Sequence, residues 1–286
     1  MSELELSSPS ILLLGDSGTG KSHSILTLLE NNIETFYCAL EPNALDTPLL
    51  RITEQKLPIE NFHWIKAPPR VSSMQNMSKM LDAVNRAADM SSLTQSKGYD
   101  QKRKCESFAK LVRNMVDFED ERTGQKFQDV ESWGPNRAII FDSNSGLCDI
   151  ARQHVAGLKP QLTQPEYGVT QEIVYQLISA LCSYDCIFVL TAHLERTQNE
   201  VSGDIETSLN AIGKKLTPRL PRLFSDIVLC QRDENRYTWT TVRNKYTVKH
   251  RFLPLGENLE PSFKPIVDKM AEVKTHFAQN SANEGA

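Results

Sequence analysis

Five short apolar runs alternate along the chain with segments of helical periodicity. Each run has the length of a β-strand and few polar interruptions, a pattern typical of strands buried on both faces. The runs lie at Ile11–Leu14, Thr35–Leu40, Asn61–Ile65, Ala138–Phe141 and Cys186–Thr191. Because strands and helices alternate, the pattern predicts an α/β fold whose mostly parallel sheet carries helices on both faces.

Four segments between these runs place apolar residues three or four positions apart, which is the spacing of one helix face. They are Ser22–Asn31, a methionine-rich stripe from Met74 to Ala88, the face Phe108–Val116, and about Gln171–Ser183. We interpret the methionine-rich stripe as part of the core rather than as a cofactor-binding face.

The last third of the chain changes character. Three short strand-like segments follow one another at Asp226–Gln231, Tyr237–Arg243 and Lys245–Phe252, with turn residues at Asp233–Asn235. They predict antiparallel strands at the edge of the sheet. We expect a single domain over residues 1–270 and a flexible, polar tail over residues 271–286.

Composition adds limits but no function. The 286 residues are 40% hydrophobic and 24% charged with a formal net charge of −4, an ordinary globular balance that leaves room for a local basic stripe. The six cysteines form no CxxC pair, which favours free thiols in a reducing compartment. The acidic, polar start does not resemble a secretory signal, and no apolar run is long enough to span a bilayer. We therefore expect a cytoplasmic protein without membrane contact.

The segment from Gly15 to Ser22 matches the phosphate-loop pattern G-x-x-x-x-G-K-[ST] at every fixed position. A buried strand precedes the segment and a helix follows it, the context in which this pattern binds phosphates. The loop N–H groups would surround the phosphates, and the following helix would add its dipole. We expect a nucleoside triphosphate, most simply Mg·ATP, to bind Gly15, Asp16, Ser17, Gly18, Thr19, Gly20, Lys21 and Ser22.

Three side chains have expected roles at this site. Lys21 would reach the β- and γ-phosphates, and the Ser22 hydroxyl would ligate Mg²⁺. Asp142 follows a buried apolar run and so lies at the carboxyl edge of the sheet, where ligands of open α/β sheets bind. We expect Asp142 to help hold the same Mg²⁺.

Hydrolysis also needs a base that orients the attacking water. Ser143, and not a glutamate, follows Asp142, so the base does not come from the next position. Glu41 is the candidate, because it directly follows the run Thr35–Leu40 and would project from the same sheet edge. A solvated carboxylate at the end of a strand is the alternative.

Four segments together resemble the RecA family of ATPases. Tyr37–Asp46 (YCALEPNALD) resembles the segment in which a strand ends in the catalytic glutamate, and Ile139–Leu147 (IIFDSNSGL) resembles the magnesium strand. Phe188–His193 (FVLTAH) resembles the strand whose last polar side chain senses the γ-phosphate. Val242–Lys245 (VRNK) resembles the basic segment through which RecA subunits reach a neighbour's ATP.

The resemblance covers about residues 9–255 and departs from RecA in one place. RecA has an Asn-Gln pair where this chain has Ala192-His193, so the resemblance implies that His193 donates a hydrogen bond to the phosphate. The N-terminal helix and C-terminal domain of RecA have no counterpart. The compact form, with Trp133-Gly134 before the magnesium strand, looks most like phage-encoded ATPases that include the Sak-type single-strand annealing proteins.

The resemblance implies a RecA-like fold in which one strand separates the loop strand from the Asp142 strand. It also implies a homo-oligomeric ring or filament with ATP at the subunit interfaces. Arg243 and Lys245 would then act on the ATP of a neighbouring subunit; a charged strand face is the alternative. For a phage-encoded protein, the location would be the host cytoplasm and a phage single-strand-binding protein would be a possible partner.

Two loops of RecA-like proteins face DNA, and here they would span about Ala151–Tyr167 and Glu195–Arg222. The end of the second loop is basic, as contacts to a phosphate backbone require. Its candidate contacts are Lys214, Lys215, Arg219 and Arg222. A solvated basic surface loop is the alternative.

Three functions fit these features. The first is a RecA-like ATPase that acts with single-stranded DNA in recombination or annealing, with hydrolysis stimulated by DNA. The second is a scaffold or regulator whose assembly depends on ATP and which does not bind DNA. The third is a ring-type, helicase-like motor built on the same core.

Overall fold

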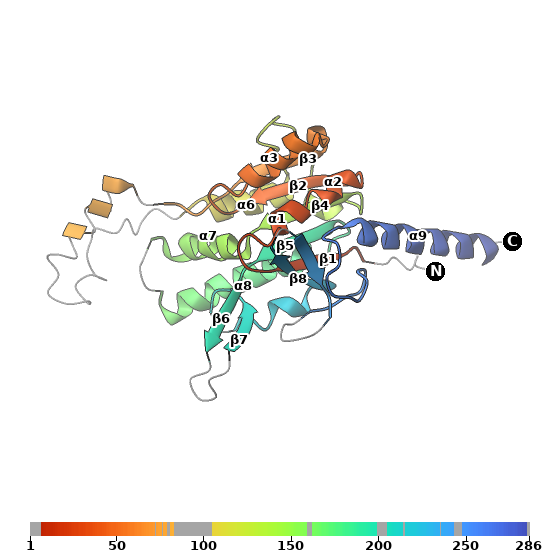
Figure 1. The fold of residues 1–286 in the computed structure, drawn as a ribbon. Helices are drawn as coiled ribbons and strands as arrows, with labels where there is room; N and C mark the ends of the chain where they lie inside the picture. Colours follow the sequence, from red (N-terminus) through yellow and green to blue (C-terminus); the bar gives the residue numbers. More distant parts are fainter. Residues whose placement is uncertain are drawn as a thin grey trace.

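The computed structural model describes residues 7–71, 73–75, 77–78, 81–82, 105–158, 162–198, 205–213, 215–234, 236–242 and 248–284. A seven-stranded sheet with the order β3-β2-β4-β5-β1-β8-β9 forms the centre of the molecule (Figure 1). Its strands are β1 (Ser10–Leu14), β2 (Glu34–Ala39), β3 (Phe62–Lys66), β4 (Arg137–Asp142), β5 (Ile187–Ala192), β8 (Asp226–Asp233) and β9 (Arg236–Thr240). All neighbouring pairs are parallel except β8 and β9.

Helices cover both faces of the sheet (Figure 1). One face packs against α6 (Ser107–Val116), α7 (Asn144–Ala156) and α8 (Gln164–Leu181). The other face packs against α1 (Lys21–Ser24), α2 (Thr27–Glu30), α3 (Asp46–Gln55) and α9 (Lys264–Glu284). Short 3-10 turns lie at Ile59–Asn61, Val130–Ser132 and Leu220–Arg222, and a separate hairpin pairs β6 (Leu194–Gln198) with β7 (Ile205–Leu209).

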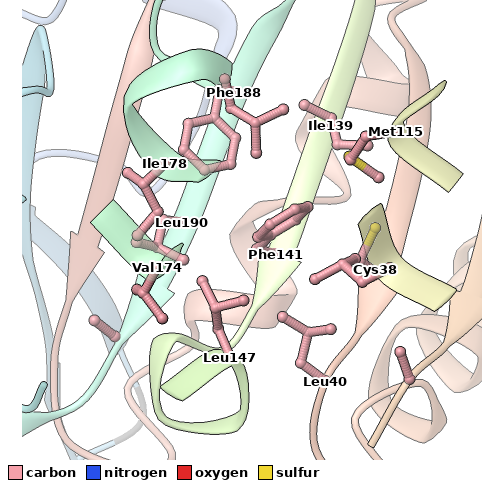
Figure 2. Close-up of a cluster of buried hydrophobic side chains, with 14 of the residues drawn as sticks. Cys38, Leu40, Met115, Ile139, Phe141, Leu147, Val174, Ile178, Phe188 and Leu190 are labelled. Atoms are coloured by element: carbon pink, nitrogen blue, oxygen red, sulfur yellow. The ribbon is translucent and has the colours of Figure 1, made fainter. Parts of the chain in front are cut away.

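The core explains why the central strands read as unbroken apolar runs. In β4, Ile139 and Phe141 point into the layer beneath α6, α7 and α8, whereas Ala138 and Ile140 point into the opposite layer. Figure 2 shows Phe141 in the first layer, among side chains from the neighbouring strands and helices. Since both layers are buried, both sets of alternating residues must be apolar.

The positions of the five predicted strands are confirmed, and so is the order of the sheet where it matters for function. Strand β5 lies between β1, which leads into the phosphate loop, and β4, which ends in Asp142. The prediction of antiparallel edge strands is confirmed for β9. Strand β8 instead runs parallel to β1, and within the described part of 245–252 there is only one bridge, from Lys249 to Ile227.

The first predicted DNA loop is mostly helical. Helix α7 continues to Ala156 and α8 begins at Gln164, so the predicted loop Ala151–Tyr167 contracts to a connection of a few residues. Helix α8 begins where Thr163 and Glu166 form a capping box, in which each side chain bonds to the backbone N–H of the other residue. The predicted start at about Gln171 was therefore too late.

The methionine-rich stripe is not core where the structure describes it. Met74, Met77 and Leu81 are 78%, 44% and 62% exposed. Helical spacing of apolar residues indicates one apolar face, but it does not identify the surface that would cover that face. No helix in the described ranges is long and apolar enough to cross a membrane.

Two helical expectations also change. The predicted helix Ser22–Asn31 is divided into α1 and α2, because the hydroxyls of Ser24 and Thr27 bond to the carbonyls three residues earlier and compete with the regular helix bonds. Helix α9 runs through residues 271–284, which we expected to form a flexible, polar tail. The flexibility of that segment stays a prediction.

Candidate nucleotide-binding site

The phosphate loop follows β1 and has a shape that only glycine allows at several positions. Gly18 and Gly20 have φ angles of 77° and 81°, a region that side chains disfavour. A Cβ atom on Gly15 would lie 2.6 Å from the Cys230 carbonyl oxygen and 2.6 Å from Thr19 Oγ1. The loop backbone therefore approaches its neighbours as closely as a phosphate cradle requires.

Lys21 lies inside this loop. Its side chain is 6% exposed, and its amino group donates hydrogen bonds of 2.8 Å each to the carbonyls of Gly15 and Asp16. Burial lowers the pKa of Lys21, and nearby carboxylates such as Asp142 oppose that shift. A desolvated ammonium group at the loop centre is suited to neutralising phosphate oxygens.

Asp142 is the meeting point of the site. Its Oδ2 accepts a 2.7 Å hydrogen bond from the hydroxyl of Ser22 and a second bond from the hydroxyl of Tyr37. Its Oδ1 accepts a 2.6 Å bond from the hydroxyl of Thr191. Three strands and the phosphate loop therefore converge on one carboxylate at the carboxyl edge of the sheet.

Tyr37 and Thr191 were not identified from the sequence as site residues. Tyr37 is fully buried, and burial together with Asp142 raises its pKa well above the ordinary range. A usable signal was present, because both hydroxyls interrupt apolar strand segments and buried polar groups nearly always have partners. The sequence alone does not give the identity of those partners.

The oxygen atoms of Ser22 and Asp142 suit Mg²⁺, which prefers hard oxygen ligands. The residues with described positions contain no group of three His, Cys, Asp or Glu side chains that could enclose a metal ion. Mg²⁺ bound to nucleotides usually keeps several water ligands and takes others from the phosphates.

Glu41 and His193 lie at the same sheet edge. Glu41 Oε1 accepts a hydrogen bond from the hydroxyl of Ser143 and lies 3.8 Å from His193 Nε2. The Leu40 N–H donates to the carbonyl of Asp142 at 2.8 Å, so the chain before Glu41 stays paired with β4. The structure thus brings the predicted base and phosphate sensor together beside Asp142. Both side chains stay about one third exposed, at 35% and 31%, which leaves them accessible to water.

Glycine at position 146 makes this arrangement possible. A Cβ atom on Gly146 would overlap the carbonyl oxygen of Leu40. Helix α7 can therefore approach the end of β2 closely only because Gly146 has no side chain, and this approach fixes the backbone that carries Glu41.

The predicted basic contacts are only partly within the described residues. Arg243, Lys245 and Lys214 lie outside them, so their roles stay predictions. Lys215 and Arg222 are exposed. The guanidinium of Arg219 lies 3.9 Å from the centroid of the Tyr175 ring and 3.7 Å from the Glu172 carboxylate, so it packs on helix α8.

No protein-family model matches the sequence, and no curated protein matches it. Among solved structures, the chain is similar to the crystal structure of the RadB recombinase, with a TM-score of 0.35 and 10% identity over 88% of this chain and 86% of that chain. It is also similar to a prototypical ATPase from the type III secretion system of pathogenic bacteria, with a TM-score of 0.35 and 14% identity over 78% of this chain and 51% of that chain. The match thus spans about half of the secretion ATPase. Similarities this distant carry no information about function.

Proposed function

We propose that the protein binds Mg·ATP and hydrolyses its terminal phosphoanhydride bond. The observation that carries this proposal is the 2.7 Å hydrogen bond between Ser22 and Asp142, which are 120 positions apart in the chain. This bond joins the last residue of a complete phosphate loop to the carboxylate at the end of β4. A loop that served only as a turn between β1 and α1 would not need this carboxylate, nor a lysine held in its interior.

Each residue has a distinct role in the proposed reaction. The loop N–H groups and Lys21 bind the phosphates and balance their charge. Glu41 orients a water molecule and accepts its proton while the water oxygen attacks the γ-phosphorus and the bond to the ADP oxygen breaks. His193, next to Glu41, donates to a γ-phosphate oxygen. Mg²⁺ held near Ser22 and Asp142 would neutralise charge on the β- and γ-phosphate oxygens.

Calorimetry of Mg·ATP binding together with a phosphate-release assay tests this proposal. Lys21→Ala should abolish tight binding, and Glu41→Gln should keep binding but lose hydrolysis. Glu131→Gln is the matched control, since Glu131 is an exposed carboxylate on the turn before β4 and should leave both properties unchanged. Native protein that fails to bind Mg·ATP would overturn the proposal, and normal hydrolysis by Glu41→Gln would exclude Glu41 as the base.

The biological setting that we propose is recombination or annealing of single-stranded DNA. The hairpin β6–β7 supports this idea, because it starts directly after His193 and projects from the body of the molecule (Figure 1). The residue that follows β7 lies next to the site. The Asn210 N–H donates to the His193 carbonyl at 2.9 Å, and the Asn144 side chain donates to the Asn210 carbonyl at 2.7 Å. A strand of nucleic acid bound to this hairpin would therefore be connected to the proposed catalytic residues through the hydrogen bonds of Asn210 to His193 and Asn144.

DNA-dependent hydrolysis distinguishes this setting from an ATP-dependent scaffold. We expect single-stranded DNA to increase hydrolysis and to bind in a salt-sensitive way. The double change Lys215→Ala and Arg222→Ala should weaken DNA binding and flatten its salt dependence, whereas Lys126→Ala, at an exposed lysine on another surface, should not. No DNA binding at low salt would exclude this setting and favour the scaffold.

A further inference from the structure

Tyr237 lies beside the phosphate loop, on the flank opposite the magnesium residues. In the sheet, β4 with Asp142 is two strands from β1 in one direction, and β9 with Tyr237 is two strands from β1 in the other. The Tyr237 ring packs directly on the loop: a Cβ atom on Gly20 would lie 2.8 Å from Tyr237 Cγ. Tyr237 is only partly buried.

His23 accompanies this ring. The centroids of the His23 and Tyr237 rings are 5.9 Å apart and the rings are tilted by 40°. His23 Nδ1 is buried and has no hydrogen-bond partner among the residues that the structure describes. Burial, and then the charge of Arg51, lower the pKa of His23, so the imidazole is neutral at neutral pH. Buried polar atoms are rarely left unpaired, so this nitrogen is open to a partner that the described residues do not supply.

The direction of a bound triphosphate connects these residues to a ligand. The β- and γ-phosphates must lie near Lys21, Ser22 and Asp142, where the lysine and the magnesium ligands are. The α-phosphate, ribose and base then extend along the loop away from Asp142. That direction leads toward β8 and β9, and therefore toward Tyr237 and His23.

We propose that Tyr237 and His23 form the site for the base of the bound nucleotide. The Tyr237 ring stacks on the base, and His23 Nδ1 forms a hydrogen bond to the base edge. The guanidinium of Arg232, 5.6 Å from the centroid of the Tyr237 ring, adds a cation next to the same platform. This inference rests on the proposed triphosphate binding and deepens it, because it makes the ligand a nucleotide and not any polyphosphate.

Binding of Mg·ATP and of magnesium tripolyphosphate, which has the phosphates but no base, provides the test. Native protein should bind ATP more tightly than tripolyphosphate. Tyr237→Ala should weaken ATP binding by about tenfold or more, as expected for the loss of one base–aromatic stack, and should leave tripolyphosphate binding unchanged. Tyr237→Phe keeps the ring and should bind ATP like the native protein. His23→Phe keeps a ring but removes the nitrogen, and should weaken ATP binding alone.

The two ligands separate a base site from a ring that only supports the loop. Equal loss of ATP and tripolyphosphate binding in Tyr237→Ala would overturn the base site, as would unchanged ATP binding in Tyr237→Ala. Trp64→Ala, at an aromatic residue on the opposite edge strand β3, is the control and should change neither affinity. Native protein that binds neither ligand would overturn the proposed function itself, and the base site with it.

Discussion

At the scale of single residues, the hydroxyl groups around Asp142 determine how that carboxylate can hold Mg²⁺. The hydroxyl of Thr191 bonds to Oδ1 at 2.6 Å, which fixes the orientation of the carboxylate and leaves Oδ2 toward Ser22. Thr191→Val removes this bond at nearly constant shape. We expect the Mg²⁺ concentration for half-maximal ATP hydrolysis to rise severalfold, and the free energy of unfolding to fall by about 1–3 kcal/mol.

A matched variant separates these two effects. Thr35 is also buried in a strand of the sheet. Its hydroxyl bonds to the Ile33 carbonyl at 3.0 Å, at the amino end of β2 and away from the nucleotide site. Thr35→Val should therefore lower stability and leave the Mg²⁺ dependence of hydrolysis unchanged. Equal Mg²⁺ requirements in the two variants would show that Thr191 is only structural.

Lys21 gives the site a dependence on alkaline pH. Because burial lowers the pKa of Lys21, its ammonium loses a proton at a lower pH than an exposed lysine, whose pKa is about 10.4. The phosphates bind the charged form, so ATP affinity should fall as the pH rises, and the fall should begin below that value. Binding should then take up protons, which calorimetry in buffers of different ionisation enthalpy detects. Lys21→Arg stays charged and should give a flatter profile; an equally flat native profile would contradict the prediction.

At the scale of elements, the approach of α7 to the end of β2 positions Glu41. Gly146→Ala would force the helix away from the Leu40 carbonyl and move the backbone before Glu41. We expect Mg·ATP binding to persist while the rate of phosphate release falls by about tenfold or more, as small displacements of catalytic groups often cause. Gly168→Ala is the control: Gly168 is in helix α8 with open space around it, so alanine should be tolerated or even stabilising. Equal rates in the two variants would exclude this role for Gly146.

The strands and the loop were predictable from sequence because each is specified locally. The apolar run before Gly15 and the loop pattern require no knowledge of the rest of the chain. Asp142 and Glu41 were also predictable, since each ends a buried run and the carboxyl ends of parallel strands share one edge. What they touch was not predictable: the partners Tyr37 and Thr191 depend on which strands are neighbours.

The wrong predictions of helix boundaries and of burial also have physical causes. Side-chain hydroxyls at Ser24 and Thr27 divide a segment whose apolar periodicity indicates one helix. The capping box of Thr163 and Glu166 can be recognised in the sequence, and it predicts that α8 begins at Gln164 and not at about Gln171. The methionine-rich stripe, exposed where it is described, was wrongly interpreted as core. Periodicity defines an apolar face and says nothing about what covers it.

At the scale of the whole molecule, the sheet order places the proposed magnesium residues and the proposed base site on opposite sides of the phosphate loop. The strands β4 and β5 supply Asp142 and Thr191 on one side of β1, and β9 supplies Tyr237 on the other. Strand β9 is antiparallel to β8, so from Arg236 to Thr240 the chain runs away from the carboxyl edge that carries Lys21. Arg243 follows this strand along the chain and lies outside the described residues, so its action on a neighbour's ATP stays a prediction.

Mixing two inactive variants tests whether a neighbouring subunit completes each ATP site. Arg243→Ala should lose hydrolysis because the neighbour's ATP lacks its arginine, and Glu41→Gln because the base of its own site is missing. In a mixture, a subunit with Glu41 can meet a neighbour with Arg243, so phosphate release should partly recover and should be greatest near equal amounts. Mixing Glu41→Gln with Lys21→Ala is the control and should not recover, since both residues belong to the site of one chain. If mass measurement in ATP shows mixed oligomers that still release no phosphate at any ratio, each site is complete within a single chain and Arg243 does not act in trans.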